Sequence, residues 1–168
     1  MAGLHVYLIG TRLKTQIEAL IQTIATEEAG DDILARQSQL PQVEFKKQRS
    51  GSDEMEAEEG ITISPLAPEG AGGTNERDDI GYRFAIVISY GTRTEDFQAN
   101  SPTEFYSQAI RQRFHHRRIG SIGLQDSWEI RATVQVGPLP DTPRLREGID
   151  GTVLVLTSYI RESRRVPN

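Results

Sequence analysis

Apolar side chains recur at helical spacing in two parts of the chain. Within residues 11–28 they stand at offsets 0, 4, 7, 8 and 11 from Leu13, on one face of a helix. Gly10 favours a break before this segment, whereas Val6 and Ile9 would continue the same stripe, so the start of the helix stays open. A capping box and a second apolar stripe predict another helix, through Ser101, Pro102, Glu104, Phe105, Ala109, Ile110 and Phe114.

Alternation of apolar and polar residues predicts the strands. The last of these segments is apolar on both faces, which is typical of a buried strand. The order of helix, two short strands, long strand, helix and two long strands predicts an α+β fold: a mainly antiparallel β-sheet with two amphipathic helices packed on one face. The expected strands are 43–46, 61–64 (closed by Pro65), 81–91, 128–136 and 152–162.

We expect a single domain over residues 1–168 that carries two long polar loops. Residues 49–60 include five carboxylates between Asp53 and Glu59 and offer almost nothing to bury. Residues 66–80 are polar and rich in glycine, which is typical of a connection. Loops of this length in a small domain are usually functional or disordered. Residues 164–168 are expected to form a frayed tail.

Composition excludes several classes of function. The chain has no cysteine, so disulfides and thiolate chemistry are excluded, and no apolar run approaches the roughly 18 residues that span a bilayer. His115 and His116 are adjacent, so on a helix their rings would diverge by about 100° and could not share a metal. A P-loop and a nucleophile elbow are both missing. We therefore expect a structural or binding protein rather than an enzyme, with no catalytic, cofactor-binding or metal-binding residues.

Charge is distributed unevenly along the chain. Residues 1–80 hold 7 basic and 15 acidic residues, net −8, whereas residues 81–168 hold 12 arginines and 9 acidic residues, net +3. A dipolar chain of this kind fits self-association or protein partners better than nucleic acid.

Arginine is favoured at desolvated contacts with carboxylates, although a solvated helix end is an equally good interpretation of these residues. The second helix is expected to close at Gly120 and Gly123, which places four arginines at its C-terminal end. An acidic stretch that faces a neighbour's arginines would form a natural contact between subunits. The candidate interface residues are Arg111, Arg113, Arg117, Arg118, Arg131 and Arg161, with Glu54, Glu56, Glu58 and Glu59.

The predicted elements follow one another in a distinctive order. An N-terminal amphipathic helix and two short strands precede the aromatic strand YRFAIVISYG, a helix that ends in AIRQRFHHRRI, and two long strands that finish with VLVLTSYIRES. This order resembles that of the tail terminator, or tail completion, proteins of tailed bacteriophages and the neck proteins related to them. The resemblance covers most of the chain outside the two expected loops, and it rests on pattern and size rather than on an invariant motif.

The resemblance implies a homo-oligomeric ring, commonly a hexamer, at the virion neck. Such a ring, assembled in the host cytoplasm, caps the tail tube, stops its polymerisation and joins the tail to the head connector. Its partners would be copies of itself, the tail tube protein and the head-connector or stopper protein, with no membrane and with DNA passing through the lumen without specific binding. The alternatives are another neck protein (a stopper or a head-completion protein) and, outside virions, a monomeric binding module that uses the long loops.

Overall fold

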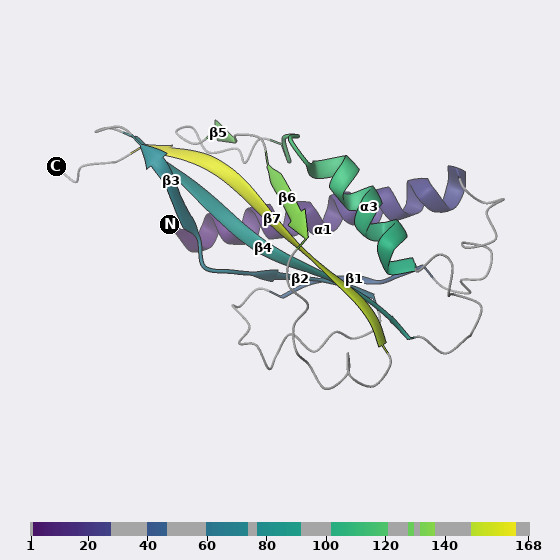
Figure 1. Ribbon diagram of the computed structural model, residues 1–168. Coiled ribbons are helices and arrows are strands. Elements are labelled where there is room, and N and C mark those ends of the chain that lie inside the picture. The colour runs from purple at the N-terminus through teal and green to yellow at the C-terminus, as the bar shows by residue number, and fades with distance from the viewer. Residues whose placement is uncertain are drawn as a thin grey trace.

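Two long antiparallel strands, β4 (Arg77–Gly91) and β7 (Ile149–Ser163), form the centre of the structure (Figure 1). They pair along their full length of 15 residues, from Arg77 opposite Ser163 to Gly91 opposite Ile149. Both strands carry alternating apolar residues through their middle, so the sheet can bury one face under the helices. The computed structural model describes residues 2–27, 40–46, 60–73, 77–91, 102–120, 128–129, 132–136 and 149–163.

Shorter strands extend the sheet on both sides of this central pair. On the outer side of β4, β2 (Gly60–Pro65) pairs with its second half and β3 (Glu69–Gly73) with its first. On the outer side of β7 lie β5 (Trp128–Glu129) and β6 (Thr133–Val136). At the edge of the sheet, β1 (Val43–Phe45) pairs with β2 in parallel. This is the one parallel pairing among the described strands. Seven described strands therefore form one mainly antiparallel sheet.

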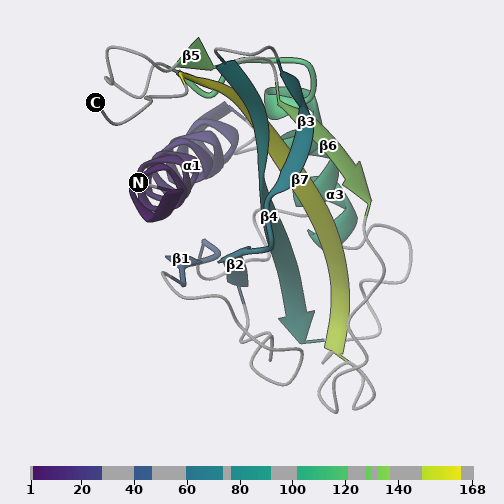
Figure 2. The same ribbon diagram turned by 90° about the vertical axis from the view of Figure 1, so that its left-hand side faces the viewer.

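The helices α1 (Ala2–Glu27) and α3 (Pro102–Phe114) pack on the same face of that sheet. Figure 2 views α1 nearly along its axis, beside the twisted sheet. The expected α+β architecture, with two amphipathic helices on one face, is confirmed. The core between helices and sheet is formed by Ile9, Leu13, Ile17 and Ile21 of α1, Tyr106, Ile110 and Phe114 of α3, Tyr82, Phe84, Ile86 and Ile88 of β4, and Leu154, Leu156 and Ile160 of β7.

The prediction of a loop over residues 66–80 is wrong in part, because β3 and the first four residues of β4 lie within it. Glu69 pairs with Gly81 and Gly70 with Ile80, with a bulge between Gly70 and Gly72. This strand pairs with β4 through the backbone, and its sequence EGAGG has no alternation of apolar and polar residues, so hydrophobic alternation cannot reveal it.

Several other boundaries differ from the expectation or lie outside the described residues. The final strand is confirmed and extends beyond 152–162 at both ends, while the strand expected over 128–136 is described as β5 and β6 only. Residues 49–59, Ser101 and 164–168 are outside the described residues, so the acidic loop, the helix N-cap and the frayed tail stay predictions. Among the helices that the structure describes, none combines the length and the hydropathy needed to cross a membrane.

Helix α1 continues through Gly10, which settles the open question of where it starts. The ring of Phe45 in β1 lies against Gly10, and a β-carbon built there would stand 2.1 Å from Cζ of that ring. Glycine therefore permits a close approach of β1 to the helix at the expense of helix propensity. The aromatic ring in turn packs at 6.4 Å, centroid to centroid, from Phe84 in the core.

This contact predicts a reversal of sign in a double-mutant cycle. We expect Gly10→Ala to destabilise the wild-type protein by about 1–3 kcal/mol, because the added methyl group collides with Phe45. In a Phe45→Ala background, the same substitution should stabilise by about 1 kcal/mol through helix propensity alone. Chemical denaturation measures the free energy of unfolding of all four proteins, and an effect of the same sign in both backgrounds would contradict the assignment.

Candidate functional site

Four exposed arginines gather around the C-terminal end of α3, and we call them the arginine surface: Arg111, Arg113, Arg117 and Arg118. Arg111 and Arg113 belong to the last turn of the helix, and the other two follow it. The structure thus brings together the four arginines that the sequence placed at a helix end.

The segment that carries Arg117 and Arg118 is held both by the end of the helix, where the N–H of Arg117 donates to the carbonyl of Phe114 at 3.0 Å, and by the residue that precedes β6. Helix α3 ends at Phe114, so the expected end at Gly120 is wrong. His116 adopts a φ of 56°, which turns the chain out of the helix. The N–H of His116 then donates to the carbonyl of Ala132 at 2.8 Å, and the N–H of Ala132 donates to the carbonyl of Arg117 at 2.9 Å. These bonds fix the arginines beside β6.

The same turn corrects the expectation for the two neighbouring histidines. The rings of His115 and His116 lie side by side, with centroids 3.9 Å apart, because His116 has left the helical conformation. Nδ1 of His115 accepts the backbone N–H of Val134 at 3.0 Å, so this nitrogen is already engaged. Within the described segments, no three histidine, aspartate or glutamate side chains come together in a way that could hold a metal ion.

The described carboxylates do not neutralise the positive charge of the arginine surface. Among the described residues, no carboxylate pairs with Arg111, Arg117 or Arg118. Arg113 donates to Oε1 of Gln16 at 3.3 Å, and its guanidinium lies 5.3 Å from the ring centroid of Phe114. Neither contact supplies a negative charge. A group of cations that repel one another in this way favours an anionic partner.

The remaining candidates behave differently from these four. Arg161 forms a bidentate ion pair with Asp79, its register partner across the two central strands, at 2.6 and 3.1 Å. Its hydrogen bonds hold the pKa of Asp79 below its ordinary value and raise the pKa of Arg161. Arg161 is therefore already engaged within its own chain. Arg131, Glu54, Glu56, Glu58 and Glu59 lie outside the described residues.

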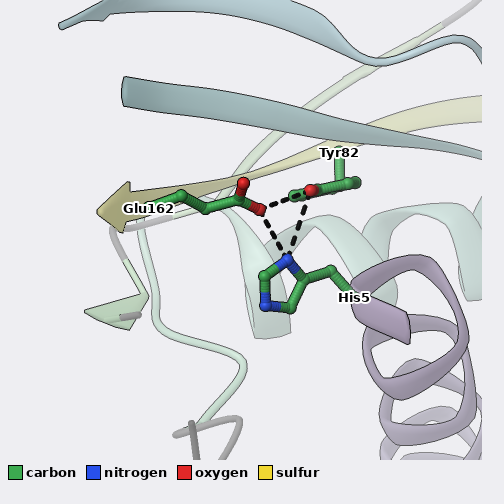
Figure 3. Close-up of polar contacts among 3 residues, drawn as sticks. All are labelled: His5, Tyr82 and Glu162. Atoms are coloured by element: carbon green, nitrogen blue, oxygen red, sulfur yellow. Dashed lines mark hydrogen bonds and ion pairs between the residues drawn. The ribbon is translucent and has the colours of Figure 1, made fainter. Parts of the chain in front are cut away.

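A buried polar cluster that sequence reasoning did not single out joins α1 to the central strands (Figure 3). Oε1 of Glu162 lies 2.5 Å from both Nδ1 of His5 and the hydroxyl of Tyr82, and accepts a hydrogen bond from each. His5 and Tyr82 are 5% and 1% exposed. These residues are 77 or more positions apart, so no local pattern could have brought them together.

The electrostatics of this cluster indicate a structural contact. Burial raises the pKa of Tyr82 well above its ordinary value of 10.0, and the hydrogen bond and charge of Glu162 raise it further. The phenol therefore stays protonated and acts as a hydrogen-bond donor. Nε2 of His5 is buried and has no hydrogen-bond partner in the described part of the chain. The cluster ties the first turns of α1 to the end of β7.

Neither a family model nor a curated protein matches this sequence. The function is therefore inferred from the geometry and charge of the chain itself.

The raised pKa of Tyr82 predicts a specific dependence of stability on pH. We expect Tyr82→Phe to lower the free energy of unfolding by about 1.5–3 kcal/mol at neutral pH, because it removes a hydrogen bond to a carboxylate. In the unfolded chain the tyrosine loses its proton from pH 10.0 upward, whereas in the folded protein it keeps the proton to higher pH. The difference in free energy of unfolding between the wild-type protein and the variant must therefore shrink as the pH rises past 10.0. Denaturation of both proteins between about pH 8 and pH 11 measures the difference, and a constant difference would contradict the assignment.

The backbone conformation of His116 makes a second prediction. We expect His116→Val to destabilise the protein by about 1–2 kcal/mol, because a β-branched side chain is strained at positive φ. His116→Gly is the matched control, since it removes the same imidazole but accepts this φ without strain. Thermal unfolding of the three proteins provides the measurement. Equal losses in both variants would mean that the ring, and not the backbone, stabilises the turn.

Proposed function

We propose that this chain is a structural subunit of a homo-oligomeric ring at the neck of a tailed bacteriophage. The ring, commonly hexameric in the class that the order of elements resembles, would cap the tail tube and stop its polymerisation. It would also join the tail to the head connector or stopper protein while DNA passes through its lumen. The proposal assigns no catalytic residue, cofactor or metal to the chain.

The observation that carries this proposal is the arginine surface on its fixed backbone, in which Arg111, Arg117 and Arg118 have no carboxylate partner among the described residues. Arg113, Arg117 and Arg118 line one open surface hollow, and Arg111 lines a neighbouring one. The backbone beneath them is fixed by α3 and by the hydrogen bonds of His116 and Arg117 to Ala132. A preformed cationic patch fits a carboxylate-rich protein surface, and residues 1–80 of this same chain carry a net charge of −8. A contact between two different patches of identical subunits repeats around an axis and closes a ring when the rotation allows it.

The passage of DNA constrains where the arginine surface would lie in such a ring. Each contact between an arginine and a phosphate strengthens binding to DNA, and several such contacts would retard transit through a channel. We therefore assign the arginine surface to contacts between subunits and not to the lumen. The fold supports this assignment, because the helices and the sheet face that they cover share one apolar core and leave the end of α3 exposed.

Removal of the gene from the phage that encodes it tests the position of the ring. We expect particles without this chain to show overlong or headless tails by electron microscopy, because nothing stops the tube or joins it to the head. Heads that attach no tail and lose DNA would identify a stopper instead. Normal, infectious particles would contradict both neck assignments.

Mass in solution separates the ring from the monomeric alternative. We expect the purified chain to form a ring by itself or at the end of tubes made of tail tube protein, as measured by native mass spectrometry and electron microscopy. A chain that stays monomeric at all concentrations and never attaches to tubes would favour a monomeric binding module.

A further inference from the structure

An open groove of about 440 Å³ lies between the second half of α1 and α3. Its base is apolar and consists of four half-buried side chains, two from each helix, which the core does not cover completely. Figure 1 shows α3 crossing this part of α1. The groove is lined by Leu20 and Ile24 of α1, by Phe105, Gln108, Ala109, Gln112 and Arg113 of α3, and by Arg117.

The side chain of Arg113, at the edge of the groove, is held in place by contacts within the chain. The side-chain amide of Gln16 donates to the carbonyl of Ile119 at 2.5 Å and accepts from Arg113 at 3.3 Å. The guanidinium of Arg113 also lies over the ring of Phe114. A guanidinium that is already positioned loses less conformational entropy when it binds a carboxylate.

The groove therefore combines an apolar base with cations at its lining. Arg113 and Arg117 line it, and both also line a neighbouring hollow that includes Arg118. A complementary ligand needs one flexible apolar side chain with carboxylates on both sides of it. The stretch of residues 53–59, Asp-Glu-Met-Glu-Ala-Glu-Glu, has this composition: five carboxylates around Met55, and methionine fills irregular apolar surfaces readily.

We propose that this groove binds the acidic stretch 53–59 of a second copy of this chain. Met55 would supply the apolar contact, and the flanking carboxylates would pair with Arg113 and Arg117. The inference deepens the proposed function and rests on it, since the contact joins a groove on one subunit to a different segment on the next. Such a head-to-tail contact is the kind that propagates around a ring.

Two charge-reversal variants test the pairing: one reverses the charge of the groove, and the other reverses the charge of the acidic stretch. We expect the groove variant Arg113→Glu/Arg117→Glu and the stretch variant Glu56→Lys/Glu58→Lys each to lose assembly when tested alone. An equimolar mixture should assemble, because the intact groove of the stretch variant meets the intact stretch of the groove variant, and the reversed groove meets the reversed stretch. The chain that carries all four substitutions should regain assembly, since the charges are then exchanged. Native mass spectrometry counts the subunits in each case.

A matched control keeps these results interpretable. Lys14→Glu also reverses an exposed cation on the helical layer, but Lys14 lies outside the groove and pairs with Glu18 on its own helix. This variant should assemble like the wild-type protein. Thermal unfolding of every variant checks that the fold is retained, which we expect because the substituted arginines are exposed. Loss of assembly in both double variants without recovery in their mixture or in the chain with all four substitutions would overturn the contact between copies.

A peptide separates failure of this contact from failure of the ring. We expect a synthetic peptide of residues 50–60 to bind the stretch variant, whose groove is intact, and to bind the groove variant at least about tenfold more weakly. Fluorescence anisotropy measures both affinities, which should fall as salt is added. Equal or undetectable binding to both proteins would overturn the inference even if the wild-type chain forms rings. Binding to the intact groove alone would support it even if no ring is found.

Discussion

The long pairing of β4 with β7 is the constraint on which the rest of the structure depends. Every other strand except β1 joins the sheet through one of these two, and both helices pack on the face that their alternating side chains present. The end that begins at Arg77 and Ser163 is tied on both faces. The cluster of His5, Tyr82 and Glu162 attaches α1 on one face, and Asp79 with Arg161 joins the two strands on the other. The register of this one pair thus places the helices and orders the polar contacts.

Hydrophobic periodicity predicted the parts of the fold that bury side chains. The helix stripe from Leu13 and the alternation around Phe84 report burial directly, so these elements could be found without coordinates. The features that the sequence did not predict depend on backbone pairing or on residues that are distant in the sequence. Strand β3 (EGAGG) has no alternation of apolar and polar residues. The close approach at Gly10 of α1 involves the ring of Phe45, 35 positions away in the sequence. The parallel direction of β1 could not be inferred from a three-residue pattern.

In the candidate site, too, the features set by neighbouring residues were predictable, and those set by residues distant in the sequence were not. The arginine surface was foreseeable, because its four residues lie within eight positions of one another in the sequence. The support of that surface was not, since it depends on a positive φ at His116 and on hydrogen bonds to Ala132, sixteen positions away. Arg161 has the same residue type as the others, yet strand register gives it Asp79 as a partner. Residue type alone therefore does not separate an arginine that stabilises the fold from one that is left for a partner.

This contrast between paired and unpaired arginines has an energetic consequence. The bidentate pair of Arg161 and Asp79 satisfies both charges within the chain, so it contributes to the folded monomer. The arginine surface does the opposite, since like charges that are fixed close together repel one another and no described carboxylate offsets them. An anionic group bound beside these arginines would offset that repulsion, and salt screens it. A rigid backbone beneath the charges keeps them from spreading apart, so the free energy they gain by binding is larger than it would be on a flexible loop.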